Sequence, residues 1–173
     1  AVGVQALTSD TLGSRSVALG YRTLYNQNYT TATNSNNTAV GYVAGNAITT
    51  GTGNTCIGAN AGDEMTTGSE NTFVGQAAVG SGIVTGDENT AVGRNSGLSL
   101  SSGSNNLFLG HDAGRTGSPG GNITTASNTI VLGDENIANA HIQVALTVAS
   151  DERDKTDFEA LPNYLSKHLN CSV

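Results

Sequence analysis

The chain has 173 residues, of which 36% are hydrophobic, 5% aromatic and 12% charged, and its net charge is −7. So few large apolar side chains cannot fill a wide globular core, yet the low charge and two prolines differ from disordered sequences, which are rich in both. The acidic balance without Lys/Arg clusters argues against nucleic-acid binding, and no apolar run has the length of a membrane span. We therefore expect neither nucleic acid nor membrane insertion.

A pentapeptide that ends in glycine recurs from the start of the chain to Gly133. Its copies are NTAVG at 37–41, NTCIG at 54–58, NTFVG at 71–75, NTAVG at 89–93 and NLFLG at 106–110, with degenerate copies at 16–20 and 129–133 and a truncated AVG at 1–3. The sequence separations between successive closing glycines are 17, 21, 17, 17, 18, 17 and 23. Two short strands and two turns per unit fit one coil of a flattened parallel β-solenoid.

This periodicity also predicts a core. We expect one aliphatic residue per coil to stack inside: Val40, Ile57, Val74, Val92, Leu109 and Leu132. The narrow side of the same core would be lined by Ala44, Ala61, Ala78 and Ala113, with Ser96 as a variant. Cys56 occupies a repeat position held elsewhere by Ala or Phe, which indicates a buried small residue, and two cysteines make no disulfide framework.

A column of asparagines opens five repeats: Asn37, Asn54, Asn71, Asn89 and Asn106. It could bind a ligand, or it could form a ladder of side chains that bond to one another and to turn backbone. The ladder is the favoured interpretation because a solenoid must satisfy the polar groups at its corners.

The two longest repeat gaps insert residues at 21–36 and 115–127, and we expect these insertions to project as loops. The first contains Tyr21, Tyr25 and Tyr29 at intervals of four. Exposed tyrosines suit carbohydrate or protein contact, and packing between subunits explains them equally well.

No metal or cofactor site is predicted. The acidic pairs at 63–64, 87–88 and 134–135 lack the spacing of a calcium repeat, which needs six to eight converging oxygens. His111, His141 and His168 have no paired ligand spacing. The glycine-rich stretch 114–122 lacks the Lys-Ser/Thr ending of a phosphate loop.

The chain changes character after Gly133. Residues 137–150 alternate loosely and indicate one or two strands that leave the solenoid. Seven charged residues then fall between Asp151 and Glu159, and Leu161, Leu165 and Leu169 recur at helical spacing around a proline, which predicts a short C-terminal helix.

The segment SDERDK at 150–155 resembles the Ser-Asp-x-Arg-x-Lys signature that opens the peptidase S74 intramolecular chaperone domain of trimeric phage tail fibres, tailspikes and endosialidases. The repeats resemble the collar and head repeats of phage fibres and trimeric autotransporter adhesins, which form left-handed parallel β-rolls. The resemblance implies a single-turnover self-cleavage between Ser150 and Asp151, with Ser150 as nucleophile, Asp151 as the new N-terminus and Lys155 as general base. Such a cut involves no external substrate. Because the family's chaperone continues well beyond this signature whereas the chain ends at Val173, we expect a structural protein rather than an enzyme.

We therefore expect an all-β, left-handed parallel β-roll or β-solenoid of about eight coils, each spanning 17 or 18 positions, with a short C-terminal helix. It would comprise a repetitive solenoid at 1–136, an exit strand or linker at 137–150 and the truncated start of a chaperone-like segment at 151–173. Thin β-rolls expose Thr- and Val-bearing faces that gain by packing on copies of themselves, which favours a homotrimer.

The expected function is a structural, adhesive segment of a virion fibre that attaches to a host surface. Its partners would be copies of itself, other fibre proteins and a host receptor, with glycans as one candidate class. A bacterial cell-surface adhesin or extracellular filament subunit is the first alternative. A self-cleaving maturation protease is the second, and a cut near residue 150 that Ser150→Ala abolishes would support it.

Overall fold

A computed structural model describes residues 1–139 and 141, and in this part of the chain all regular structure is β. The strands are β1 (Gly13–Ser14), β2 (Val17–Leu19), β3 (Thr33–Asn34), β4 (Thr38–Val40), β5 (Thr55–Ile57), β6 (Thr72–Val74), β7 (Thr90–Val92), β8 (Leu107–Leu109) and β9 (Ile130–Leu132). They belong to one compact unit, Ala1–Ala138. The predicted C-terminal helix lies outside the described residues.

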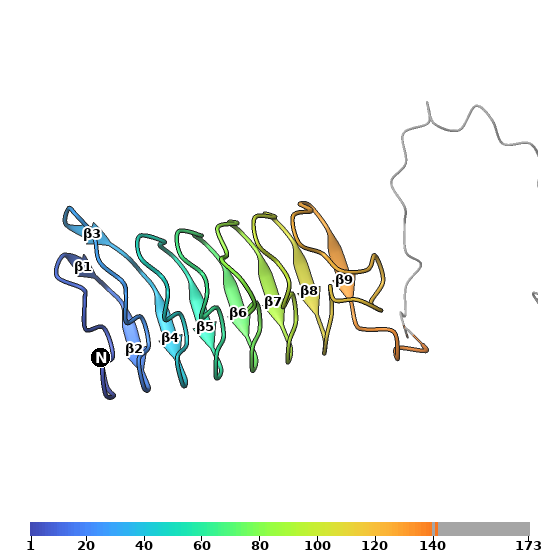
Figure 1. Ribbon diagram of the computed structural model, residues 1–173, viewed down its shortest axis with the longest axis horizontal. Helices are drawn as coiled ribbons and strands as arrows, with labels where there is room; N and C mark the ends of the chain where they lie inside the picture. Colours follow the sequence, from blue (N-terminus) through green and yellow to red (C-terminus); the bar gives the residue numbers. More distant parts are fainter. Residues whose placement is uncertain (140, 142–173) are drawn as a thin grey trace, which may run out of the picture. The chain divides into compact units, whose positions relative to one another are not determined.

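The strands form a parallel β-solenoid (Figure 1). β2, β4, β5, β6, β7, β8 and β9 make one seven-stranded sheet in chain order, and every neighbouring pair is parallel. β1 and β3 pair in a separate parallel ladder. The strands β4 to β8 follow one another at the regular repeat length, so the regular stack has about five turns, fewer than the eight expected. The coils that join β2 to β4 and β8 to β9 are longer.

Hydrogen bonds between coils continue beyond the sheet. In the turn that follows β4, the N–H of Gly45 donates to Ala61 O of the next coil at 2.9 Å. Further along the same coil, Thr49 N–H donates to Thr66 O at 2.9 Å. Thr66 N–H in turn donates to Val84 O at 2.9 Å. Backbone groups are thus paired around the coil, which lets a chain with little core stay folded.

The middle residue of each strand in the seven-stranded sheet points into the core. These residues are buried and in register along the sheet: Ala18, Ala39, Cys56, Phe73, Ala91, Phe108 and Val131. Because strand side chains alternate between faces, the third strand residues lie on the outer face. The prediction that Val40, Ile57, Val74, Val92, Leu109 and Leu132 stack inside is therefore wrong: these side chains are half-buried or exposed.

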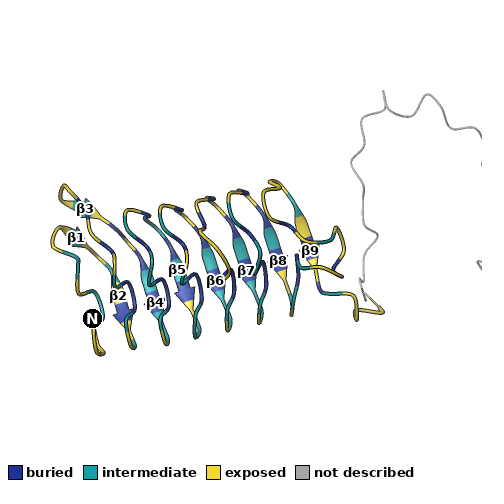
Figure 2. Cartoon of the chain, viewed as in Figure 1, coloured by how far each residue is buried: buried dark blue, intermediate teal, exposed yellow. Residues whose placement is uncertain are grey.

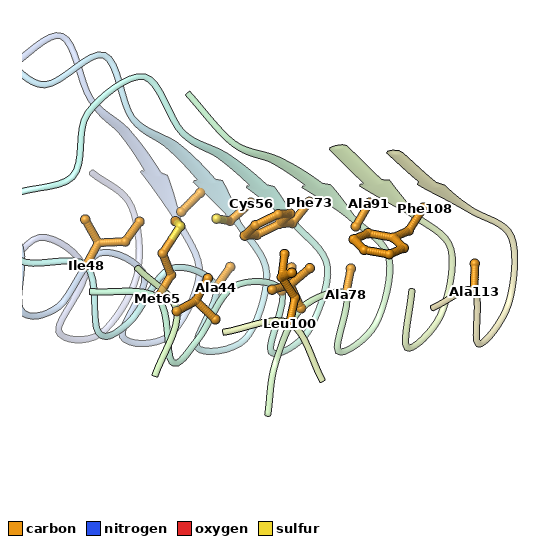
Figure 3. Packing of buried hydrophobic residues seen from close by; sticks show 14 of the residues in the cluster. Ala44, Ile48, Cys56, Met65, Phe73, Ala78, Ala91, Leu100, Phe108 and Ala113 are labelled. Carbon is orange, nitrogen blue, oxygen red and sulfur yellow. The ribbon is translucent and has the colours of Figure 1, made fainter. Parts of the chain in front are cut away.

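The opposite wall of the core is built from larger residues, namely Leu24, Ile48, Met65, Val84, Leu100 and Ile123. The predicted narrow side is confirmed: Ala44, Ala61, Ala78, Ser96 and Ala113 are all fully buried. Ser96 satisfies its hydroxyl by donating to Phe108 O at 3.0 Å. Figure 3 shows Phe73 and Phe108 in one row with the small residues Cys56 and Ala91, so that large and small side chains alternate within a narrow interior.

Glycine is required at the turn that closes each strand. Gly41 and Gly75 have φ values of +136° and +134°, a region that residues with a Cβ rarely adopt. A Cβ on Gly41 would also lie 2.6 Å from the carbonyl oxygen of Gly58 in the next coil. The closing glycine of each repeat therefore permits the close stacking of one turn on the next.

The second residue after the closing glycine adopts the left-handed conformation in several coils, whatever its type. Asn60 and Asn95 have φ values of 59° and 56°, and Val43 has a φ of 60°. Asparagine tolerates the left-handed region, whereas a β-branched residue is strained there. Val43 is thus a local mismatch between residue type and backbone.

The asparagine column is a buried ladder, which confirms the structural interpretation. Asn54 Nδ2 donates to Gly68 O at 2.8 Å, and its Oδ1 accepts the backbone N–H of Asn71 at 3.0 Å. Asn71 repeats the pattern with Gly86 O at 3.0 Å and the backbone N–H of Asn89 at 2.9 Å. Each of these side chains therefore donates to a carbonyl at the end of its own coil and accepts from the backbone N–H of the first residue of the next coil.

The prediction that the two long segments project as loops is only partly correct. The first supplies fully buried Leu24 and Gln27, and the second supplies Ile123, which is 8% exposed. Residues between 116 and 120 are mostly exposed. The insertions therefore lengthen coils that still contribute to the core.

Candidate interaction surfaces

The outer face of the seven-stranded sheet is aliphatic and uncharged. The first residues of its strands are Val17, Thr38, Thr55, Thr72, Thr90, Leu107 and Ile130, and the third residues are Leu19, Val40, Ile57, Val74, Val92, Leu109 and Leu132. We call these fourteen residues the outer face. Its aliphatic members include Leu19, Ile57 and Leu109, which are 47%, 39% and 46% exposed. Figure 2 colours β9 largely as exposed, since Ile130 and Leu132 are exposed although Val131 between them is buried.

Such a face is unusual for this kind of sheet. Most parallel sheets have helices on both faces, and their strands are apolar on both sides; here no helix of the described residues covers the outer face. Seven strands at ~4.8 Å and three residues at ~3.3 Å give a flat area of roughly 300 Å², comparable with the largest apolar patches that monomers leave exposed. The outer face is therefore the strongest candidate for contact with another chain.

A groove of about 290 Å³ opens at one end of this face. Glu88, Asn105 and Asn128 line one side of it, while Thr90, Leu107 and Ile130 belong to the outer face. Asn105 Nδ2 donates to Asn128 Oδ1 at 2.7 Å. The groove joins polar side chains to an aliphatic floor and widens the surface that a partner could contact.

The three predicted contact tyrosines are not equivalent. Tyr29 is only 6% exposed: its hydroxyl donates to Gly51 O at 2.8 Å and accepts from Asn37 Nδ2 at 3.2 Å. Burial raises the pKa of this hydroxyl despite the hydrogen bond from Asn37. The prediction of Tyr29 as a surface contact is therefore wrong, because this side chain supports the asparagine ladder.

Tyr25 and Tyr21 lie nearer the surface. The guanidinium of Arg22 sits 4.3 Å from the centre of the half-buried Tyr25 ring, a cation–π contact. Tyr21 is 41% exposed and stacks on Tyr42, with ring centres 5.4 Å apart and planes 10° from parallel. Sequence reasoning missed Tyr42, although both tyrosines directly follow a closing glycine.

A polar cluster lies on the same corner at the other end of the stack. His111 Nδ1 lies 3.2 Å from Asp134 Oδ2, and its Nε2 contacts Arg94. Asp112 is partly desolvated, but hydrogen bonds from Asn95 (2.9 Å) and Arg115 (3.0 Å) outweigh that effect and hold the pKa of its carboxyl below the usual range.

The same cluster lowers the pKa of Asp134. Hydrogen bonds from the side chain and backbone of Asn136 contribute most, and His111 adds to them. These contacts join three successive coils. Among the described residues no three His, Cys, Asp or Glu side chains are placed to hold a metal ion.

The residues of the predicted self-cleavage site lie outside the described part of the chain. Ser150, Asp151 and Lys155 therefore remain predictions from the resemblance. No helix within residues 1–139 and 141 is long and apolar enough to cross a membrane.

Comparison with known proteins returned no match to a protein family, a curated protein or a solved structure.

Proposed function

We propose that this chain is a structural, adhesive segment of a homotrimeric fibre, of the kind that attaches a virion to its host. One observation carries the proposal: an uncharged aliphatic face runs the length of the seven-stranded sheet. A rigid solenoid with such a face suits lengthwise packing against copies of itself.

The gain from covering this face is substantial. At about 25 cal/mol per Å², burial of roughly 300 Å² per chain contributes at most about 7 kcal/mol, because the face includes threonines and half-buried residues; this upper bound is of the order of the entropic cost of association. The first and third residues of the strands both contribute along the whole sheet, so the surface offered to another chain is continuous. The choice of three chains follows from the resemblance of residues 150–155 and the repeats to trimeric fibres.

The uneven chemistry of the surface supports an adhesive role. The sheet face is uncharged, whereas the corner after each strand carries Tyr42, Gln76, Arg94 and His111, all exposed. Packing through the face would leave this corner available for other partners.

Electron microscopy of the purified full chain tests the proposal. We expect thin multimeric rods whose particles bind to cells of a susceptible host. Globular monomeric particles would contradict the fibre role.

A further inference from the structure

The corner after each strand carries one side chain per coil. The residues that directly follow the closing glycines are Val4, Tyr21, Tyr42, Ala59, Gln76, Arg94, His111 and Asp134. We call this set the corner column. Its register is fixed by the backbone, because Tyr42 O accepts Asn60 N–H at 2.8 Å and Gln76 O accepts Asn95 N–H at 2.9 Å, one coil apart.

Large side chains contact one another along this column. The Tyr21 and Tyr42 rings stack at 5.4 Å, close to the ~4.8 Å spacing of the coils, so that their planes follow the coils. At the other end Arg94 contacts His111. Ala59 interrupts the column because it carries only a methyl group.

The interruption leaves a slot. Tyr42 presents one ring face to Tyr21 and the other toward the coil of Ala59, and it is 57% exposed against 41% for Tyr21. Gln76 lies one coil beyond Ala59, so two coil spacings, ~9.6 Å, separate it from Tyr42 along the stack. That interval accommodates one further ring stacked on Tyr42, as Tyr42 stacks on Tyr21.

We propose that this slot binds a pyranose ring of an oligosaccharide, with the Tyr42 ring against its apolar C–H face. The inference deepens the adhesive part of the proposed function and rests on it. Beyond the slot, Gln76 and Arg94 present an amide and a guanidinium, which can donate to sugar hydroxyls. An apolar aromatic side chain would offer these donors no acceptor, whereas the hydroxyls of a sugar can accept from them.

An array of printed oligosaccharides that end in glucose, galactose, N-acetylglucosamine or sialic acid tests the site on the full chain. We expect the wild type to bind at least one class and Tyr42→Ala to lower its apparent affinity about tenfold. Ala59→Tyr fills the slot and extends the Tyr21–Tyr42 stack, so it should abolish binding without loss of thermal stability.

Thr67→Tyr is the matched control, since it adds the same side chain to an exposed position of the same coil. It should bind as the wild type does. A wild type that binds no oligosaccharide, or an Ala59→Tyr variant that binds normally, overturns the site. The oligomeric state of the same samples separates this failure from failure of the fibre role: multimers without glycan binding overturn the slot alone.

Discussion

Removal of one rung of the asparagine ladder should destabilise the solenoid far more than its size suggests. Asn71→Ala deletes a fully buried side chain that donates to Gly86 O and accepts from the backbone of Asn89. Because two buried backbone groups lose their partners, at about 1–3 kcal/mol each, we expect a loss of about 4 kcal/mol in the free energy of unfolding. Urea denaturation followed by circular dichroism measures it.

Two further variants sharpen this test. Thr67→Ala changes an exposed residue of the preceding turn and should alter stability by less than about 0.5 kcal/mol. Asn71→Asp keeps the shape but loses the donor and buries a charge, so its stability should improve as pH falls and the carboxyl is protonated. A loss below about 1 kcal/mol for Asn71→Ala would refute the ladder as the main support of each coil.

Three smaller predictions concern single residues. Burial raises the pKa of the Cys56 thiol to about 12, so in a Cys171→Ser background it should react with a thiol reagent at pH 8 only after denaturation. Val43→Asn places a tolerant residue at φ 60° and should stabilise the protein by about 1 kcal/mol in urea melts; a loss would refute the strain argument. Desolvation raises the pKa of Asp63 despite its bond from Asn60, so the charged form is disfavoured in the folded state. Asp63→Asn should therefore gain stability over the wild type as pH rises above about 4, with no gain below it, and a pH-independent difference would contradict this.

The repeat and its recurring glycines and asparagines could be predicted from the sequence because each coil imposes the same requirements on backbone conformation and hydrogen bonding. The closing glycines mark positions where a Cβ would strike the next coil, as at Gly41. The asparagines mark buried backbone groups that need a partner of fixed shape, as Asn54 provides for Gly68. Such local requirements recur in every coil and are therefore visible as a period.

The inward direction of each strand could not be predicted. A strand of three residues such as Thr72–Val74 is too short to reveal its alternation. The other buried residue beside this strand is polar Asn71, two positions before Phe73, whereas aliphatic Val74 faces outward. A rule that places the last aliphatic residue inside therefore assigns the wrong face of the strand to the core.

Contacts between coils of unequal length were also hidden. Tyr21 and Tyr42 stack across one of the longer coils, and only the register of β2 against β4 aligns them. Tyr29 lies in the same long coil, where its hydroxyl reaches Gly51. Neither contact follows from the regular spacing of the tyrosines.

We propose that the outer face is buried between three copies of the chain, and the mass of the full protein in solution decides whether it is. Sedimentation equilibrium should give the mass of three chains for the wild type. Ile57→Lys combined with Val74→Lys places two charges in the middle of the outer face and should give monomers, whereas Thr67→Lys should remain trimeric. A monomeric wild type, or a double-lysine variant that stays trimeric, would contradict the account.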